Sequence, residues 1–262
     1  MLGKLLKYDF KETSRLLLPI YAGLLIISLF GKLMLATNLY TSIPDALQIL
    51  TIFTYILLII ACCMGAPIYF IVYFYRSLYS DKGYVMHTLP VTTHQKLFSK
   101  LITSFVMELL TFAVCFLSVL IILYERESFA WLSRVFQSAA PSFLAATDMH
   151  FSTFIILTLI LLLISLLSQL LMYYASISLG QLFGGHRVLG AIAAYMGLNF
   201  ISQIISSIIL IVLSVGSMDT YALMTGRTII ALYGLTGCLN LLLALGYYMI
   251  CYYIMEKKLN LN

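Results

Sequence analysis

One acid and four amides lie inside apolar runs of this sequence, where polar side chains are costly. Glu108 stands in such a run, and an ionisable group at such a position commonly serves transport or proton relay. Together with Gln169, Asn199, Gln203 and Asn240, it could line a partly polar translocation pathway. The same side chains could instead form hydrogen bonds between helices, each worth about 0.6 kcal/mol. Glu108 could also pair with Lys100, two turns earlier, or reach towards the membrane surface.

The sequence contains no recognisable catalytic or metal-binding pattern. HExxH and GxSxG do not occur, and Gly31-Lys32 lacks the glycine and the hydroxyl residue of a Walker A motif. Five cysteines lie in apolar runs without CxxC spacing, and His87 and His94 flank Pro90 in an arrangement poorly suited to a metal. We therefore expect no catalytic residue, no metal site and no cofactor bound by this chain, and we expect that it is not an enzyme.

The composition indicates which solvent surrounds these residues. Hydrophobic residues make up 62% of the 262 positions and charged residues only 10%, well below the share usual in soluble domains. The mean hydropathy is +1.03. Six apolar runs are long enough to cross a bilayer of about 30 Å as helices. The predicted fold is an all-α bundle of six transmembrane helices in one domain, 16–262, with spans near 16–35, 47–75, 101–124, 151–178, 188–215 and 228–255.

The distribution of Lys and Arg predicts the orientation, because basic residues favour cytoplasmic loops. With six spans both termini share one side, and that side carries eleven of the fifteen basic residues. Both termini are therefore expected in the cytoplasm. The basic residues are scattered rather than clustered with aromatic residues, so no nucleic-acid partner is expected.

Two segments outside the spans are predicted to lie on the membrane surface. In residues 1–15 an apolar face that includes Leu5 and Phe10 opposes a cationic stripe formed by Lys4, Lys7, Lys11 and Arg15. This pattern predicts an amphipathic elbow helix on the anionic inner leaflet before the first span. Residues 125–150 predict a short interfacial helix on the outer side, with Trp131 as its aromatic anchor.

The predicted cytoplasmic loop at 76–100 is too structured for a simple linker. Gly83 can adopt a positive φ and turn the chain, Pro90 ends whatever precedes it, and Thr92 to Gln95 matches a capping box. The third helix is therefore expected to begin just after Thr92, in the cytoplasm. The loop also carries apolar residues, which could form a docking surface or pack on the protein's own helix ends: Tyr84, Val85, Met86 and Leu89.

The run Asp-Lys-Gly-Tyr-Val-Met-His-Thr-Leu-Pro-Val-Thr at positions 81–92 resembles the first cytoplasmic loop of ABC-2-type transporter permeases from Gram-positive bacteria. The opening Met1–Lys11 is similar to the amphipathic helix that starts those subunits. The resemblance implies a coupling helix that contacts an ATP-binding subunit through Gly83, Tyr84, Val85, Met86, His87, Leu89, Pro90, Thr92 and Gln95. The chain departs from sterol-moving members, because residues 216–227 are too short for their outer helices.

The resemblance further implies the membrane-spanning subunit of a bacterial ABC exporter in the plasma membrane. Two permease subunits, identical or different, would form the pathway for an amphipathic substrate such as a peptide, an antimicrobial or a lipid-like compound. Separate cytoplasmic ATPase subunits would bind ATP and Mg²⁺ and drive transport.

Two other functions stay open at this level. A secondary, ion-coupled transporter needs intramembrane charges, for which Glu108 is the candidate, and inverted repeats, which are not evident. A non-transporting membrane scaffold is also compatible with six apolar spans. A neighbouring gene for a Walker-motif ATPase would favour the exporter.

Overall fold

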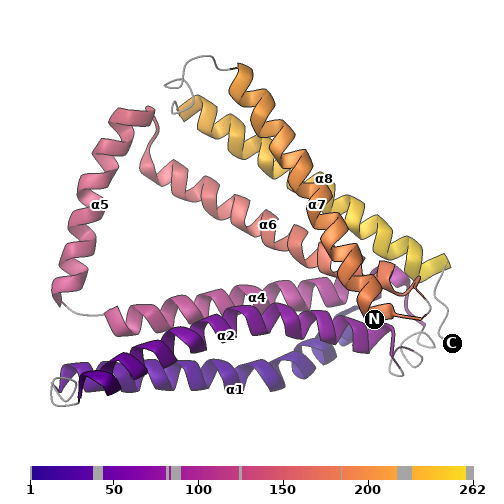
Figure 1. The fold of residues 1–262 in the computed structure, drawn as a ribbon, viewed down its shortest axis with the longest axis horizontal. Helices are drawn as coiled ribbons and strands as arrows, with labels where there is room; N and C mark the ends of the chain where they lie inside the picture. The colour runs from indigo at the N-terminus through magenta and orange to yellow at the C-terminus, as the bar shows by residue number, and fades with distance from the viewer. Residues whose placement is uncertain are drawn as a thin grey trace. The chain divides into compact units, whose positions relative to one another are not determined.

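The computed structural model describes residues 2–37, 44–80, 83, 90–123, 126–183, 185–216 and 226–257. These residues form seven α-helices and no strand (Figure 1). The helices are α1 (Leu2–Ala36), α2 (Asp45–Leu78), α4 (Thr93–Leu123), α5 (Arg126–Thr147), α6 (Phe151–Gly180), α7 (Arg187–Gly216) and α8 (Gly226–Lys257).

Six of these helices are long and apolar enough to cross a membrane, and α5 is the exception. Each predicted span lies on one of the six, except that residue 124 falls outside the described residues. By helix length and hydropathy the chain is therefore a multi-pass membrane protein with six candidate spans. The prediction of six spans from continuous apolar runs is confirmed.

The predicted elbow at residues 1–15 is wrong as a separate element, because α1 continues without a break into the first span. One buried face explains the continuity. Asp9, Thr13, Leu17, Tyr21 and Leu24 are all buried and follow one another at intervals of three or four residues. This spacing keeps them on the same side of one helix across the expected boundary. The four basic residues predicted on the membrane surface are exposed, as an amphipathic helix requires: Lys4, Lys7, Lys11 and Arg15.

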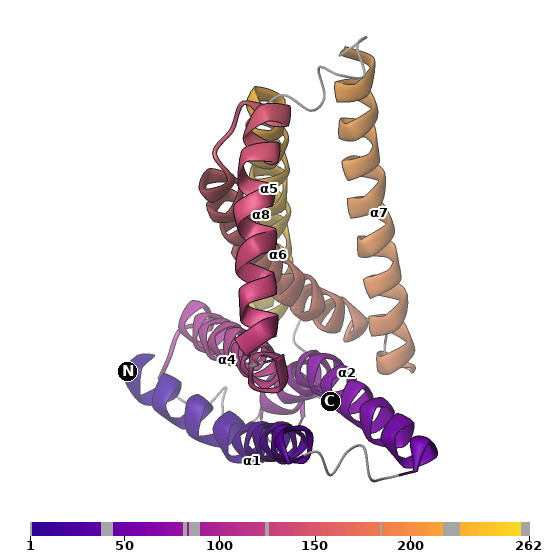
Figure 2. The ribbon, with the colours of Figure 1, turned by 90° about the vertical axis from the view of Figure 1, so that its left-hand side faces the viewer.

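The first compact unit comprises residues 1–76 and 90–132 and contains α1, α4 and almost all of α2. Within it α4 lies along α1, as Figures 1 and 2 both show. Helix α2 reaches the pair through long side chains, such as Tyr73 towards α1 and Tyr55 towards α4. These contacts make the interior of the unit unusually polar for a membrane helix bundle.

The second compact unit comprises residues 77–89 and 133–262. Helix α6 packs on both α8 and α7. At the C-terminal end of α6 a Cβ on Gly180 would lie 2.6 Å from the backbone nitrogen of Ala191. The glycine is therefore needed for the close approach of α6 and α7, as small residues allow at helix contacts in membranes.

Helix α5 is longer than the short interfacial helix predicted outside the spans. It carries Trp131, which is exposed, and it ends where Asp148 adopts a positive φ of 57°. The Asp148 N–H donates to the Leu144 carbonyl at 2.9 Å, which closes the last turn. The chain then reverses into α6.

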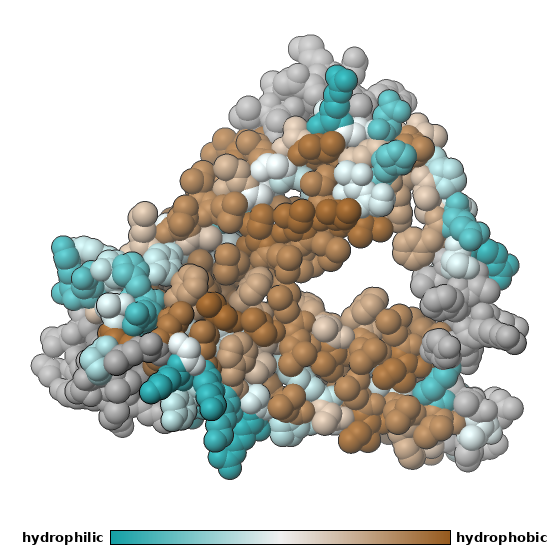
Figure 3. Space-filling model, turned by 180° about the vertical axis from the view of Figure 1, so that it is seen from behind, coloured by the Kyte–Doolittle hydropathy of each residue, from teal (hydrophilic) through white to brown (hydrophobic). Residues whose placement is uncertain are grey.

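The outer surfaces of the long helices are apolar (Figure 3). Ile49, Phe53 and Met64 of α2 and Val188 and Met249 of the second unit are each at least three-fifths exposed. An exposed apolar surface of this extent would be unstable in water, whereas lipid acyl chains solvate it. Lipid contact therefore explains a chain whose side chains are apolar outside and partly polar inside.

Candidate functional site

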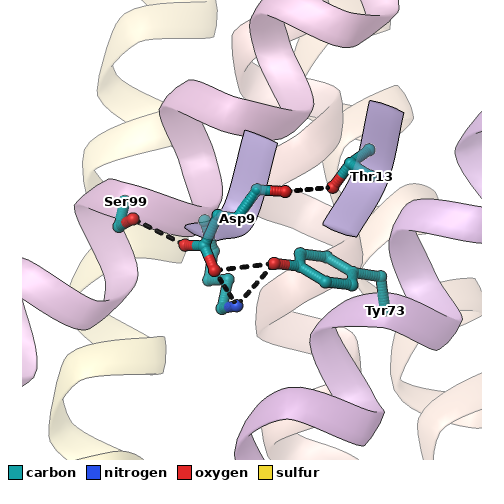
Figure 4. Close-up of polar contacts among 5 residues, drawn as sticks. Asp9, Thr13, Tyr73 and Ser99 are labelled. Atoms are coloured by element: carbon teal, nitrogen blue, oxygen red, sulfur yellow. Dashed lines mark hydrogen bonds and ion pairs between the residues drawn. The ribbon is translucent and has the colours of Figure 1, made fainter. Parts of the chain in front are cut away.

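The most elaborate polar site in the described residues is centred on Asp9, near the start of α1 (Figure 4). The Lys100 ammonium of α4 donates to Asp9 Oδ1 at 2.7 Å, and the two side chains are 1% and 5% exposed, respectively. An ion pair this deeply buried must satisfy its remaining hydrogen-bonding capacity mainly within the protein, because so little of either side chain is open to solvent.

Two hydroxyl groups supply those remaining contacts. Tyr73 of α2 donates to Asp9 Oδ1 at 2.7 Å and accepts from the Lys100 Nζ at 2.7 Å. Ser99 donates to Asp9 Oδ2 at 2.6 Å. Lys100 Nζ also lies 4.2 Å from the centre of the Tyr73 ring, in a cation–π contact. We call Asp9, Tyr73, Ser99 and Lys100 the Asp9 cluster.

The helices bring these residues together for local reasons. Thr13, one turn after Asp9, donates its hydroxyl hydrogen to the Asp9 backbone carbonyl at 2.8 Å. The buried Thr13 hydroxyl therefore has a hydrogen-bond partner on its own helix. Ser99 and Lys100 follow the capped start of α4 by about two turns, and Tyr73 lies just over one turn before the end of α2. The Asp9 cluster thus joins three helices where α2 ends and α4 begins. The charges of Asp9 and Lys100 balance each other, so the cluster is a contact without net charge that holds the three helices together.

Glu108, the predicted intramembrane acid, lies on the buried face of α4 and is 4% exposed. The expected alternative pairing with Lys100 is wrong, because Lys100 binds Asp9 instead. Glu108 Oε2 is buried and has no hydrogen-bond partner among the described residues. The carboxyl group is therefore enclosed but not neutralised by a cation.

The four predicted amides all belong to the second unit, whereas Glu108 belongs to the first. Gln169 of α6 and Asn199 of α7 both donate to the Tyr195 hydroxyl, at 3.5 Å each. Asn240 of α8 donates to Ser165 of α6 at 3.5 Å, and Gln203 is exposed. Three amides thus bond between or along helices, as the structural alternative predicts, and the structure describes no site that unites all five residues.

The predicted coupling segment is described only at its edges. Tyr84, Val85, Met86, His87 and Leu89 lie outside the described residues. The start of α4 is confirmed: the helix begins at Thr93, and the Gln95 N–H donates to the Thr92 Oγ1 at 3.4 Å. Pro90 and Thr92 are exposed, and Gln95 is half-buried.

The expectation that Gly83 has a positive φ is wrong, since no described glycine has one. Gly83 is instead buried in a tight turn, and its N–H donates to the Ser80 carbonyl at 2.6 Å. A Cβ at this position would lie 2.7 Å from the Leu78 carbonyl carbon. The glycine is required by steric contact with backbone and not by its dihedral freedom.

The beginning of the coupling segment is anchored on the second unit. The hydroxyl groups of Tyr79 and Ser178 lie 2.7 Å apart, and Ser178 also contacts the Cys251 sulfur at 3.6 Å. Burial raises the pKa of the Tyr79 hydroxyl above its ordinary value. The hydrogen bond with Ser178 acts in the opposite direction but is the smaller effect, so the pKa stays raised. Tyr79 therefore stays protonated at physiological pH and keeps its hydrogen bond to α6.

Sequence patterns alone do not predict the Asp9 cluster. Counting basic residues assigns Lys100 to topology, and the amphipathic pattern of residues 1–15 gives Asp9 no role. One signal was available: Asp9 shares its helix face with Thr13, Leu17 and Tyr21 rather than with the lysines. An acid on the apolar side of a helix predicts a buried partner, although the pattern does not say which one.

No group of three or more His, Cys, Asp or Glu side chains in the described part of the chain is arranged to hold a metal ion. In comparisons with known proteins, no family model, no curated protein and no solved structure matches the chain. What helix length and hydropathy establish is a multi-pass membrane protein with six candidate spans.

Proposed function

We propose that this chain is the membrane-spanning subunit of an ABC exporter of the ABC-2 type. It forms the translocation pathway with a second permease subunit and is driven by separate cytoplasmic ATPase subunits, which bind ATP and Mg²⁺. The resemblance of residues 81–92 to a coupling loop and the six candidate spans support this function.

One structural observation carries the proposal. Residues 77–89 belong to the second compact unit, whereas the body of α2 before them and α4 after them belong to the first. The Tyr79 hydroxyl fastens this segment to α6, and the covalent chain fastens it to α2 and α4. A partner that moves this segment therefore acts on helices of both compact units at once.

This connection suits a transporter that alternates between two arrangements. ATP-driven movement of the ATPase subunits would displace the segment together with the helix ends on either side of it. Packed helices shift as rigid elements, so a small displacement at their ends changes access elsewhere in the bundle. The half-buried amides of α6, α7 and α8 would then face an amphipathic substrate, such as a peptide or a lipid-like compound.

Purification from the bacterial cells that make the protein tests the proposal. The wild-type chain should bring down a protein with a Walker-type ATP-binding domain, and the complex should hydrolyse ATP. The double variant Tyr84→Glu/Met86→Glu should release that ATPase. Thr37→Glu is the matched control, since Thr37 is exposed just after α1 on the predicted outer side.

Two outcomes would contradict the proposal in different ways. If the double variant retains the ATPase, the coupling segment is wrongly assigned. If the wild-type chain copurifies with no ATP-hydrolysing subunit, the exporter itself is wrongly assigned, and an ion-coupled transporter becomes the better explanation.

A further inference from the structure

The buried face of α4 is mainly polar along its whole length. Lys100, Ser104, Glu108, Thr111 and Ser118 are all buried and lie on one side of the helix. At 1.5 Å per residue, the distance from Lys100 to Ser118 is about 27 Å, close to the thickness of a bilayer's hydrocarbon core. We call this row of side chains the polar seam.

Hydroxyl groups from the neighbouring helices complete the polar seam. Tyr21 of α1 places its hydroxyl 2.6 Å from that of Thr111, and Tyr55 of α2 places its hydroxyl 2.7 Å from that of Ser118. At the other end stands the Asp9 cluster, in which Tyr73 and Ser99 add two more hydroxyl groups. Each hydroxyl can accept one proton and donate another, so such groups can relay protons.

Glu108 occupies the middle of the polar seam, about 12 Å along the helix from Lys100. The groups that face it from the other helices are the Tyr21 hydroxyl of α1 and the Cys62 thiol of α2. Both are neutral in their ordinary forms at physiological pH. The nearest cation on its own helix, Lys100, is bound to Asp9. An ionised Glu108 would thus be an uncompensated buried charge, which the protonated acid avoids.

The unpartnered Oε2 distinguishes Glu108 from a structural acid. A buried carboxyl that serves only to join helices has hydrogen bonds to its neighbours, because leaving an oxygen unsatisfied is costly. Glu108 has a free oxygen, and Thr103 on the same helix has a second buried oxygen without a partner. Such groups are rare in native proteins and require an explanation, and for a carboxyl group the binding and release of a proton is one.

We propose that Glu108 is a proton-binding site halfway along the polar seam. The carboxylic acid gives its proton to a neighbouring hydroxyl, which at the same time donates its own proton to the next group of the seam, and the last group releases one proton to bulk water. Glu108 is left as a carboxylate, and the reverse relay returns one proton to it when the conformation reverts. The ligand is the proton itself, and the exchange does not depend on whether an ATPase partner drives transport.

Infrared spectroscopy of the full-length protein in lipid vesicles tests this proposal at neutral pH. A carbonyl stretching band of a protonated carboxylic acid is expected, and Glu108→Gln should remove it. In D₂O the band should shift as the proton exchanges. Tyr21→Phe and Ser104→Ala should each slow that exchange several-fold. Ser176→Ala is the matched control, because Ser176 is equally buried but bonds to its own helix at the Met172 carbonyl.

A hydrophobic carbodiimide gives a second measurement on the wild-type chain, which keeps the test valid if a variant fails to fold. This reagent adds to protonated carboxyl groups, so Glu108 should be labelled while exposed Glu256 should not. Lack of both the acid band and the label would overturn the proposal. A band that never exchanges in D₂O would also overturn it, since it would show a permanently protonated structural acid. Release of the ATPase partner leaves these results unchanged.

Discussion

Asp9 and Lys100 form an ion pair of 2.7 Å although 91 residues separate them in the sequence. The pair joins α1 to α4 through charge, whereas lipid-exposed helices usually associate through small residues and dispersion forces. Both charges are enclosed, so the free energy of the pair depends on each partner remaining in place.

Removal of one charge should destabilise the protein strongly. Lys100→Met leaves the Asp9 carboxylate buried without a cation, and breaking such a pair typically costs about 3–5 kcal/mol. Lys7→Met, which removes an exposed lysine of α1, should change stability little. Unfolding in mixed micelles would measure both values. The double variant Asp9→Leu/Lys100→Met should recover most of the loss, and failure to recover would show that the pair does more than neutralise charge.

Replacing each of two glycines by alanine should change the melting temperature in opposite directions. In a helix interior, Gly→Ala normally stabilises by about 1 kcal/mol. Gly197 of α7 has open space where a Cβ would stand, so Gly197→Ala should raise the melting temperature. At Gly180 the new Cβ would meet the backbone of Ala191, so Gly180→Ala should lower it and loosen α6 from α7. Equal shifts in both variants would contradict the close approach.

A similar comparison tests the turn at Gly83. Gly83→Ala should push the chain away from the Leu78 carbonyl and expose the segment after α2, whereas Gly65→Ala meets nothing within 4 Å. Limited trypsin digestion should therefore cut the Gly83→Ala variant faster between residues 76 and 96. Unchanged digestion would mean that the backbone accommodates the methyl group without moving the segment.

The attachment of Tyr79 to Ser178 should depend on pH only in the alkaline range. Burial raises the folded pKa of Tyr79, so its contribution to stability is complete below about pH 10, the ordinary tyrosine value. The contribution is lost as pH rises through the higher folded value. Tyrosinate absorbance of wild type minus Tyr79→Phe should show one tyrosine that titrates late, and normal titration would contradict its burial.

The elements predicted correctly are those with local causes. Continuous apolar runs determine the spans, and Thr92 with Pro90 determines where α4 begins. The elbow prediction failed because the basic stripe from Lys4 to Arg15 occupies only one side of a helix whose other side continues past residue 15. Charge pattern describes one face, and burial of the opposite face decided the length of α1.

The candidate site was less predictable because its contacts join distant parts of the chain. Glu108 could be recognised as unusual from its apolar surroundings, but its separation from Lys100 depended on Asp9 taking that partner. Likewise, Gln169 and Asn199 both donate to the Tyr195 hydroxyl. This shared partner depends on how α6 packs against α7, which residue spacing along one helix does not reveal.

The ion pair also imposes an order on biosynthesis. Ribosomes add about 5–20 residues per second, so Lys100 is made roughly 5–20 s after Asp9. During this delay the nascent α1 holds an acid without its cation and cannot settle fully into lipid. We expect chains stalled before residue 100 to leave a cysteine introduced by Thr13→Cys, one turn from an intact Asp9, accessible to a water-soluble reagent. Chains stalled well beyond α4 should protect this cysteine. The position of α1 is then fixed only after α4 has been made.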